Sequence, residues 1–492
     1  IAASWRVWHK GQDDVLAILL GVGTIMAFGA ALSVTPRWLS VVMAATTFAG
    51  LFALLRGRDS RWLQSLLWGS AIITLYCLVD DWSIAAELEH LIGSEREHDL
   101  GRALIRWSAA LLPWVALAWH ETNSRLRGFA EVMTALLAYG LVAQFLPDEA
   151  LTWVAATGAI AVWHFQRTRS AAQWTLVVLT ALWALAPLVA WALNALEALG
   201  GDPMYLRDVP DVRELVLRVL PFAAALTVIR FRTPHTATAT DTRIPILALP
   251  VLIVVVHSLF KQLFAIDTNT DFITYGLAER TLWQGLLLGG AVLLHRGVWG
   301  IAAMPKIAML LAGTALAHAL WFTGLIHNPL WDRQAVGPTP VANLVLIAGT
   351  IATLAAVLLR NRPPVTLRPT IDGLTMLVVS VTALALLRQL FAGTILIDEP
   401  MSQTEDLLRS LLGIVLALGF LLLGKWRDER SWRIGSLVLI LLAVAKVFLV
   451  DAAGLEGLLR IASFMALGFS LIGIGWFYAR QLKPLESKSE LD

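Results

Sequence analysis

Apolar stretches that are long enough to cross a lipid bilayer follow one another along almost the whole chain. The hydrocarbon core of a bilayer is about 30 Å thick, so a crossing helix needs about 20 mostly apolar residues. By this criterion of length, the sequence predicts roughly sixteen transmembrane helices, of which the sixth and the tenth are the shortest. They are expected at residues 15–34, 38–55, 62–79, 103–119, 128–146, 150–164, 173–194, 214–229, 244–264, 281–295, 304–324, 341–359, 371–392, 407–424, 434–452 and 458–478.

The composition requires a lipid environment for these helices. Hydrophobic residues make up 58% of the 492 residues and charged residues only 15%, whereas soluble domains have about 45–50% and about 25%. A soluble globule of this composition could not cover its surface with polar groups. We therefore expect an all-α, polytopic transmembrane helical bundle. Its single cysteine, Cys77, excludes an intramolecular disulfide and a multi-cysteine metal site.

Basic residues are distributed unequally between the two sides of the expected bundle. If the helices alternate in direction, 24 of the 38 Lys and Arg residues fall on the side that also holds both chain ends, and the loops of the other side hold 7. Because loops rich in Lys and Arg stay in the cytoplasm, we expect both termini to be cytoplasmic. No signal peptide is readable, since the first apolar stretch begins near Val15 and is long enough to span the membrane.

Two segments in the second half of the chain resemble each other, which indicates an internal repeat. The sequence KQLF recurs as RQLF 127 residues later. This offset contains four expected helices, an even number, which predicts parallel repeats rather than inverted ones. The expected division is an N-terminal part, two repeat units and a cytoplasmic tail, at 1–243, 244–370, 371–480 and 481–492. The aligned residues are Lys261 with Arg388, Glu279 with Glu405 and, approximately, His318 with Lys446.

Ionised residues lie within or beside the expected helices, where a charge costs about 2.5–3.5 kcal/mol at the helix centre. Lys446 lies about 7.5 Å below Asp451 along a helix. The following turn, DAAGLEG, returns the chain into the membrane and brings Arg460 down beside Lys446. The repeat delivers further charges to the same side. We expect a substrate-binding site in the outer half of the membrane, formed by Lys261, Glu279, His318, Arg388, Glu405, Lys446, Asp451, Glu456 and Arg460.

A purely structural role for the same charges stays open. The Lys446 side chain is long enough to extend its ammonium group to the membrane interface. Glu456 and Arg460 are four residues apart, which is the spacing of an ion pair within one helix. In this interpretation the charges only hold helix hairpins together.

Motifs that would reveal an enzymatic reaction are absent from the sequence. It has no metal-ligand spacing, Walker motif, nucleophile elbow or dinucleotide fingerprint. We expect no cofactor, no metal and no nucleic-acid partner. Asp80 and Asp81 are candidates for a paired-carboxylate site, with ordinary surface acidity as the competing explanation. They open an acidic outer loop in which the apolar spacing of residues 82–92 predicts a short amphipathic helix.

The C-terminal half carries a family resemblance. The segments RQLFAG and KVFLVDAAGLEGLLRIASFMALGFSLIGIGWFY, and HNPLW with the following VG and VANL, resemble the bacterial polytopic membrane proteins grouped as domain of unknown function 2339. The resemblance extends over roughly residues 250–480. It implies a bacterial inner-membrane protein, and it implies that this chain is the C-terminal portion of a longer one. The matching motif residues are Arg388, Glu405, Lys446, Asp451, Gly454, Glu456 and Arg460.

Three functions are compatible with these observations. The first is a non-enzymatic transporter or envelope-assembly component that binds an anionic lipid or glycan precursor in the outer half of the membrane. The second is a membrane-embedded transferase that uses a lipid-linked donor, with Asp80 and Asp81 as base or metal ligands. The third is a scaffold subunit of a larger membrane complex. The expected partners are membrane lipids, an anionic lipid or glycan, and other membrane subunits.

Overall fold

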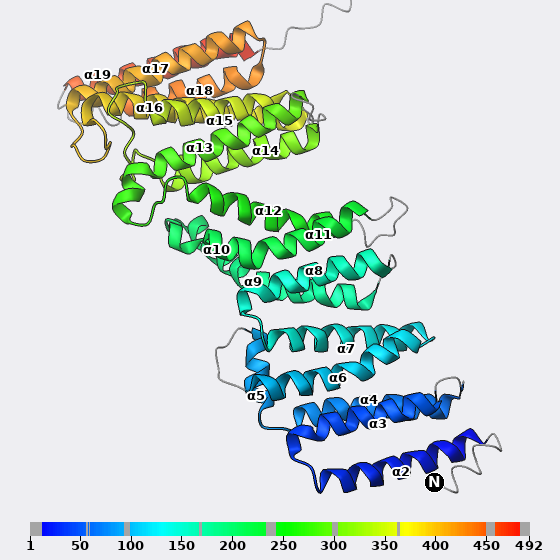
Figure 1. Ribbon diagram of the computed structural model, residues 1–492. Helices are drawn as coiled ribbons and strands as arrows, with labels where there is room; N and C mark the ends of the chain where they lie inside the picture. Colours follow the sequence, from blue (N-terminus) through cyan, green and yellow to red (C-terminus); the bar gives the residue numbers. More distant parts are fainter. Residues whose placement is uncertain are drawn as a thin grey trace, which may run out of the picture. The chain divides into compact units, whose positions relative to one another are not determined.

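The computed structural model is built of helices (Figure 1). It describes residues 12–55, 58, 60–92, 99–166, 170–232, 243–297, 304–361, 365–448 and 458–482. Within these ranges there is no strand, and the single β-bridge joins Ala335 to Ile395. The all-helical fold class expected from the sequence is therefore confirmed.

The chain divides into two compact units. Unit 1 comprises residues 1–193 and 208–259, and unit 2 comprises residues 194–207 and 260–492. The division expected from the internal repeat, with boundaries after residues 243 and 370, stays a prediction.

Unit 1 is a series of helices joined mostly by short turns. Its interior is closely packed because small side chains let neighbouring helices approach. Gly140, for example, lies against the Trp107 indole, where a Cβ atom would have no room. The elements are α2 (Asp13–Leu32), η1 (Arg37–Leu39), α3 (Ser40–Leu55), α4 (Arg61–Val79), α5 (Ile84–Glu89), η2 (His90–Ile92), α6 (Leu100–His120), α7 (Ser124–Ala143), α8 (Asp148–Gln166), α9 (Ala171–Gly200, which ends in unit 2), α10 (Val212–Glu214), η4 (Leu215–Val219), α11 (Leu220–Arg232) and α12 (Arg243–Lys261, whose last two residues are in unit 2).

Unit 2 contains the longer helices that position the candidate site. Helix α13 begins after a capping box formed by Thr268 and Asp271, and it ends at Gly297, which has the left-handed conformation typical of a helix C-terminus. Helix α14 continues directly into the π-helix η5. The elements are η3 (Leu206–Asp208, which lies at the unit boundary), α13 (Asn269–Arg296), α14 (Pro305–His318), η5 (Ala319–Ile326), α15 (Leu344–Arg360), η6 (Val365–Leu367), α16 (Arg368–Ala392), α17 (Gln403–Trp426), α18 (Arg430–Lys446) and α19 (Leu458–Leu482).

All of the apolar ranges expected to span the membrane overlap described helices. The two shortest expected ranges belong to longer helices, α8 with 19 residues and α13 with 28. Within the described part of the chain, 8 helices are long and apolar enough to cross a membrane, and the expectation of about sixteen crossings stays a prediction. The 8 helices are Asp13–Leu32, Arg37–Leu55, Arg61–Val79, Ser124–Ala143, Ala171–Gly200, Pro305–Ile326, Arg368–Ala392 and Gln403–Trp426.

Large apolar side chains also cover much of the helix surfaces. Helix α2 exposes Ile18, Val22, Ile25 and Met26, and comparable rows occur on the helices that follow. In water such rows would form large apolar patches. In a bilayer they contact acyl chains, while each helix satisfies its own backbone hydrogen bonds.

Candidate functional site

Lys261 and Glu279 form a buried ion pair in unit 2. Lys261 is the last residue of α12, and Glu279 lies about three turns into α13. The distance from Lys261 Nζ to Glu279 Oε1 is 2.7 Å. Two residues expected in one site therefore do meet, and their contact offsets part of the cost of removing each charge from water.

Arg388, Glu405 and Arg409 form a second cluster between α16 and α17. Glu405 is fully buried and accepts from Arg388 Nη1 at 2.5 Å and from Arg409 Nη2 at 2.7 Å. Arg388 Nε also donates to the Leu396 carbonyl at 2.8 Å, and Arg388 Nη2 donates to the Glu399 carbonyl. The arginine is thus held by a carboxylate and by the backbone of the loop that joins the two helices.

Lys446, at the end of α18, extends this cluster to a third helix. Its Nζ lies 2.9 Å from Asp406 Oδ1 and 2.8 Å from Ser410 Oγ, both on α17. Asp406 follows Glu405 directly in the sequence, so Arg388 and Lys446 approach α17 at neighbouring positions. Sequence reasoning missed Asp406 and Ser410 as partners of Lys446.

Three of the predicted site residues have side chains outside the described part of the structure. Asp451 and Glu456 lie outside the described residues, and the Arg460 side chain is likewise outside the description. Their predicted contacts with Lys446 stay predictions.

His318 has a different environment from Lys446, with which it was aligned. It is the last residue of α14, and its Nδ1 lies 3.2 Å from Gln284 Nε2. Its ring is 4.7 Å from the ring of Phe322 in η5. His318 therefore joins α13 to the start of the π-helix.

Asp80 and Asp81 have different contact partners in unit 1 and do not form a paired-carboxylate arrangement there. Asp81 forms an ion pair with Arg106 at 3.1 Å, whereas Asp80 is exposed and accepts from the Tyr76 hydroxyl at 3.4 Å. Arg106 also binds Glu87 at 2.9 Å; Glu87 lies in α5, the short helix expected from the apolar spacing of this loop. No group of three metal-ligating side chains occurs among the described residues.

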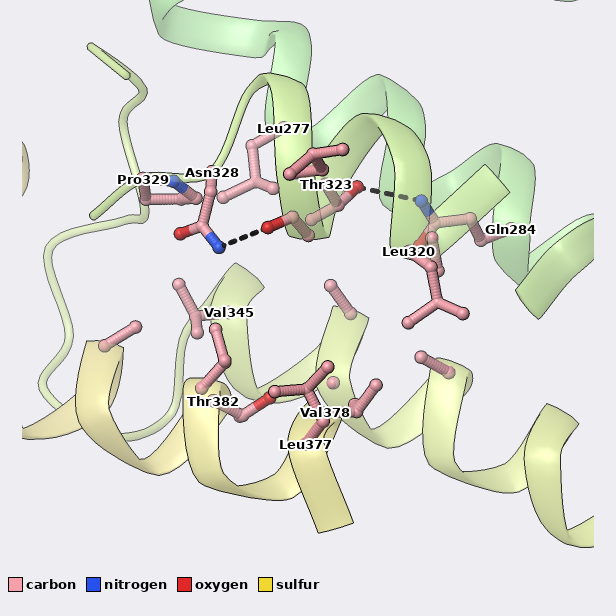
Figure 2. A pocket seen from close by; sticks show the side chains of 18 of the residues that line it. Leu277, Gln284, Leu320, Thr323, Asn328, Pro329, Val345, Leu377, Val378 and Thr382 are labelled. Carbon is pink, nitrogen blue, oxygen red and sulfur yellow. Dashed lines mark hydrogen bonds between the residues drawn. The ribbon is translucent and has the colours of Figure 1, made fainter. Parts of the chain in front are cut away.

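A cavity of about 420 Å³ lies in unit 2, between α13, η5, α15 and α16 (Figure 2). Its walls are mostly apolar, with Leu277, Val345 and Val378 among the labelled side chains. Gln284 and Thr323 contribute polar groups and are joined by a hydrogen bond of 2.9 Å. None of the described residues predicted for the site lines this cavity.

Comparison with known proteins gives one match. The sequence profile of the family described as "Predicted membrane protein (DUF2339)" matches residues 1–481. The chain belongs to the DUF2339 family. The family resemblance seen over residues 250–480 thus extends across almost the entire chain, including the N-terminal half. No curated protein matches, and no solved structure matches.

Arg280 is the residue of this DUF2339 protein that sequence reasoning missed most clearly. The expected helix begins at residue 281 and leaves Arg280 in the preceding outer loop, but Arg280 lies inside α13 and is only 8% exposed. Its Nη2 donates to Gln334 Oε1 at 2.9 Å and to the His327 carbonyl at 3.5 Å, and its guanidinium lies 5.3 Å from the Phe272 ring centre. The pair Thr268 and Asp271 has the spacing of a capping box and could have revealed that α13 begins well before residue 280.

His327 and Asp332 complete the polar group around Arg280. His327 Nδ1 lies 2.8 Å from Asp332 Oδ2, which Gln334 Nε2 also approaches at 3.4 Å. Burial lowers the pKa of His327, the Arg280 charge lowers it further, and the contact with Asp332 opposes both effects. At neutral pH the imidazole is therefore uncharged, and Arg280 carries the positive charge of this group.

Proposed function

We propose that this DUF2339 protein is a non-enzymatic component of the bacterial inner membrane, either a transporter or an envelope-assembly protein. In this proposal it binds an anionic lipid or a lipid-linked glycan precursor, and the hydrocarbon chain of that ligand occupies the cavity in unit 2. The cavity is the observation that carries the proposal. Ligand pockets commonly have volumes of about 300–1,000 Å³, apolar walls and a few polar groups, and this cavity fits that description.

The dimensions of the cavity also suit a lipid chain. Its lining residues on α16 extend from Leu374 to Ala385, which corresponds to roughly 16 Å at 1.5 Å per residue. That is about half the thickness of the hydrocarbon core of a bilayer. A site of this length accommodates part of an acyl or polyprenyl chain and leaves the polar end of the molecule near the membrane surface.

The predicted charged residues have a supporting role in this proposal. Lys261, Arg388 and Lys446, each with a carboxylate partner, fix the helix ends around the polar part of the ligand. Asp451, Glu456 and Arg460 would extend the same layer, and His318 would position Gln284 at the cavity wall.

The proposed topology has about sixteen crossings, parallel repeats and both termini in the cytoplasm. The ion pairs Lys261–Glu279 and Arg388–Glu405 support the repeat. In each case a basic residue at the end of one helix binds a glutamate in the next helix. The aligned residues therefore make equivalent contacts.

Filling the cavity tests the proposed function. Val378→Trp would place an indole among the lining side chains. We expect native mass spectrometry of the full chain, extracted gently from its membrane, to show lipid bound to the wild type and a loss of at least about ten-fold in the variant, since overpacking a filled site is costly. Leu390→Trp is the matched control, because Leu390 is on the same helix, is 57% exposed and does not line the cavity. Equal lipid retention by both variants would contradict the proposal.

A scaffold subunit is the second candidate function. The ion pairs of Lys261, Arg388 and Lys446 favour it. Charges that already have partners within the protein need no ligand, and holding helices together can be their whole role. The same mass spectra distinguish the two functions. Stoichiometric binding of another membrane protein, with no bound lipid in the wild type, would support the scaffold and exclude the lipid site.

A further inference from the structure

Arg280 is buried in unit 2 with most of its hydrogen-bonding capacity unused. Its Nη2 has acceptors, but its Nε and Nη1 are buried and donate to none of the described residues. It also forms no ion pair within 4 Å among these residues, in contrast to Lys261, Arg388 and Lys446. A buried guanidinium whose donors lack acceptors and that makes no direct ion pair is costly, so the arrangement points to an anionic ligand that supplies the missing acceptors.

The protein holds Arg280 in place in spite of this cost. The Phe272 ring lies against the guanidinium, and Gly276 leaves the space that Nη1 occupies, since a Cβ atom there would be 3.2 Å from it. The loop that follows η5 is fixed as well, because Ala335 N donates to the Ile273 carbonyl at 2.8 Å and Val336 N donates to the Thr394 carbonyl at 2.9 Å. The free donors therefore belong to an ordered arrangement.

Arg280 lies beside the cavity. Leu277 and Gln284, three residues before it and four after it on α13, both line the cavity, as do Asn328 and Pro329 next to His327. Residues at these spacings share one face of a helix. Gln284 is itself fully buried, and its Oε1 accepts no hydrogen bond from the described residues. Arg280 thus lies on the face of α13 between two residues that line the cavity, about one turn from the free acceptor of Gln284, and its own side chain lies next to the cavity lining.

We propose that Arg280 binds the phosphate group of a phospholipid whose hydrocarbon chain occupies the cavity, and that it selects lipids with a net negative charge. This inference rests on the proposed function. Glu279 and Asp332 lie near Arg280, and their negative charges partly offset its positive charge. The site therefore suits a phosphodiester with a single negative charge. Phosphatidylglycerol has such a headgroup, whereas the ammonium group of phosphatidylethanolamine would face the Arg280 charge unfavourably.

The test compares these two lipids, with identical acyl chains, on the full-length protein. Occupancy is measured by native mass spectrometry after exchange into mixed micelles of each lipid. We expect the wild type to prefer phosphatidylglycerol by at least about ten-fold, a difference of about 1.4 kcal/mol that comes from the ammonium group of phosphatidylethanolamine, since both lipids carry the phosphate. R280Q should reduce the preference to less than about three-fold while both lipids still bind, and R280K should retain part of it. R333Q is the control, because Arg333 is an exposed arginine of the same region and is paired with Asp398.

The outcomes separate this inference from the proposed function. A wild type that binds both lipids equally, or an R280Q protein that keeps the full preference, overturns the phosphate site and leaves the lipid cavity standing. A wild type that binds neither lipid overturns the phospholipid site, and a wild type that in addition carries no lipid of any kind when extracted from its membrane overturns the proposed function. If R280Q does not fold, R280K decides: a preference equal to that of the wild type overturns the role of the arginine, and a reduced preference supports it. Inorganic phosphate distinguishes the source of the anion: if it raises the thermal midpoint of the wild type, raises that of R280K less and leaves that of R280Q unchanged, the anion site is supported and free phosphate is its ligand.

Discussion

Glu405 is a single carboxylate that contacts two cations, the buried Arg388 and the half-buried Arg409. It lies between Arg388 and Arg409 and is itself fully buried. We expect Glu405→Gln to destabilise the protein by about 3–5 kcal/mol, because removing one partner leaves buried charges uncompensated. Asp398→Asn is the matched control, since the exposed Asp398–Arg333 pair is worth only about 0–1 kcal/mol. Thermal unfolding in detergent measures both, and equal shifts of the midpoint would contradict the prediction.

His327 gives unit 2 a defined dependence on pH. Its pKa in the folded protein is lowered from 6.5, chiefly by burial and also by Arg280. The unfolded chain therefore binds more protons than the folded protein below about pH 6.5, and stability falls as the pH decreases through this range. We expect His327→Gln to reduce the loss of thermal stability between pH 7.5 and pH 5.5. An identical loss in the variant and the wild type would show that other groups determine it.

Four of the charged residues that the sequence predicted for one site form two contacting pairs in the structure, while the site and the repeat themselves stay predictions. Lys261 with Glu279 and Arg388 with Glu405 were expected in one site, and each pair is in direct contact. Arg280 was missed because a single basic residue near a helix end has the same sequence appearance in a loop and in a buried site. The unused donors of Arg280 can be recognised only in the folded protein, in which the loop after η5 packs over α13.

At the scale of elements, Gly349 determines how closely α15 approaches α16. A Cβ atom at this position would lie 2.2 Å from Thr382 Oγ1, and both residues line the cavity. We expect Gly349→Ala to cost about 1–3 kcal/mol by overpacking, with partial recovery in the double variant that also carries Thr382→Ala. Gly373→Ala on α16 is the control, because no heavy atom lies within 4 Å of its added Cβ. Thermal midpoints that fall equally for Gly349→Ala and Gly373→Ala would contradict this reason.

The helices themselves could be predicted, because a run of apolar residues long enough to span a bilayer has few alternative structures. The exact hydrogen-bonding pattern could not. Residues Ala319–Ile326 are apolar in the same way as the preceding residues of α14, yet they form the π-helix η5. A change of the backbone hydrogen bonds from i→i−4 to i→i−5 does not alter the spacing of apolar residues enough to be recognised in the sequence. Here the change occurs in a wall of the cavity.

At the scale of the whole molecule, the direction of each helix across the membrane follows from the charges at its ends. Residues 393–402, before α17, contain no Lys or Arg, whereas the turn after it is flanked by Lys425, Arg427 and Arg430. By the preference of basic residues for the cytoplasm, the first segment is expected outside and the second inside. Helix α17 has 24 residues, about 36 Å, so it is long enough to separate them.

Single-cysteine labelling tests this direction. Cys77 is buried and is replaced by Ala, after which cysteine is introduced in place of Asp398 or Asp428, whose side chains are both exposed. We expect a membrane-impermeant thiol reagent to label Asp398→Cys in intact spheroplasts, and to label Asp428→Cys only after the membrane is permeabilised. Labelling in the opposite order would reverse the topology. It would also place Arg280 toward the cytoplasmic side, where the ligand would have to enter from the inner leaflet.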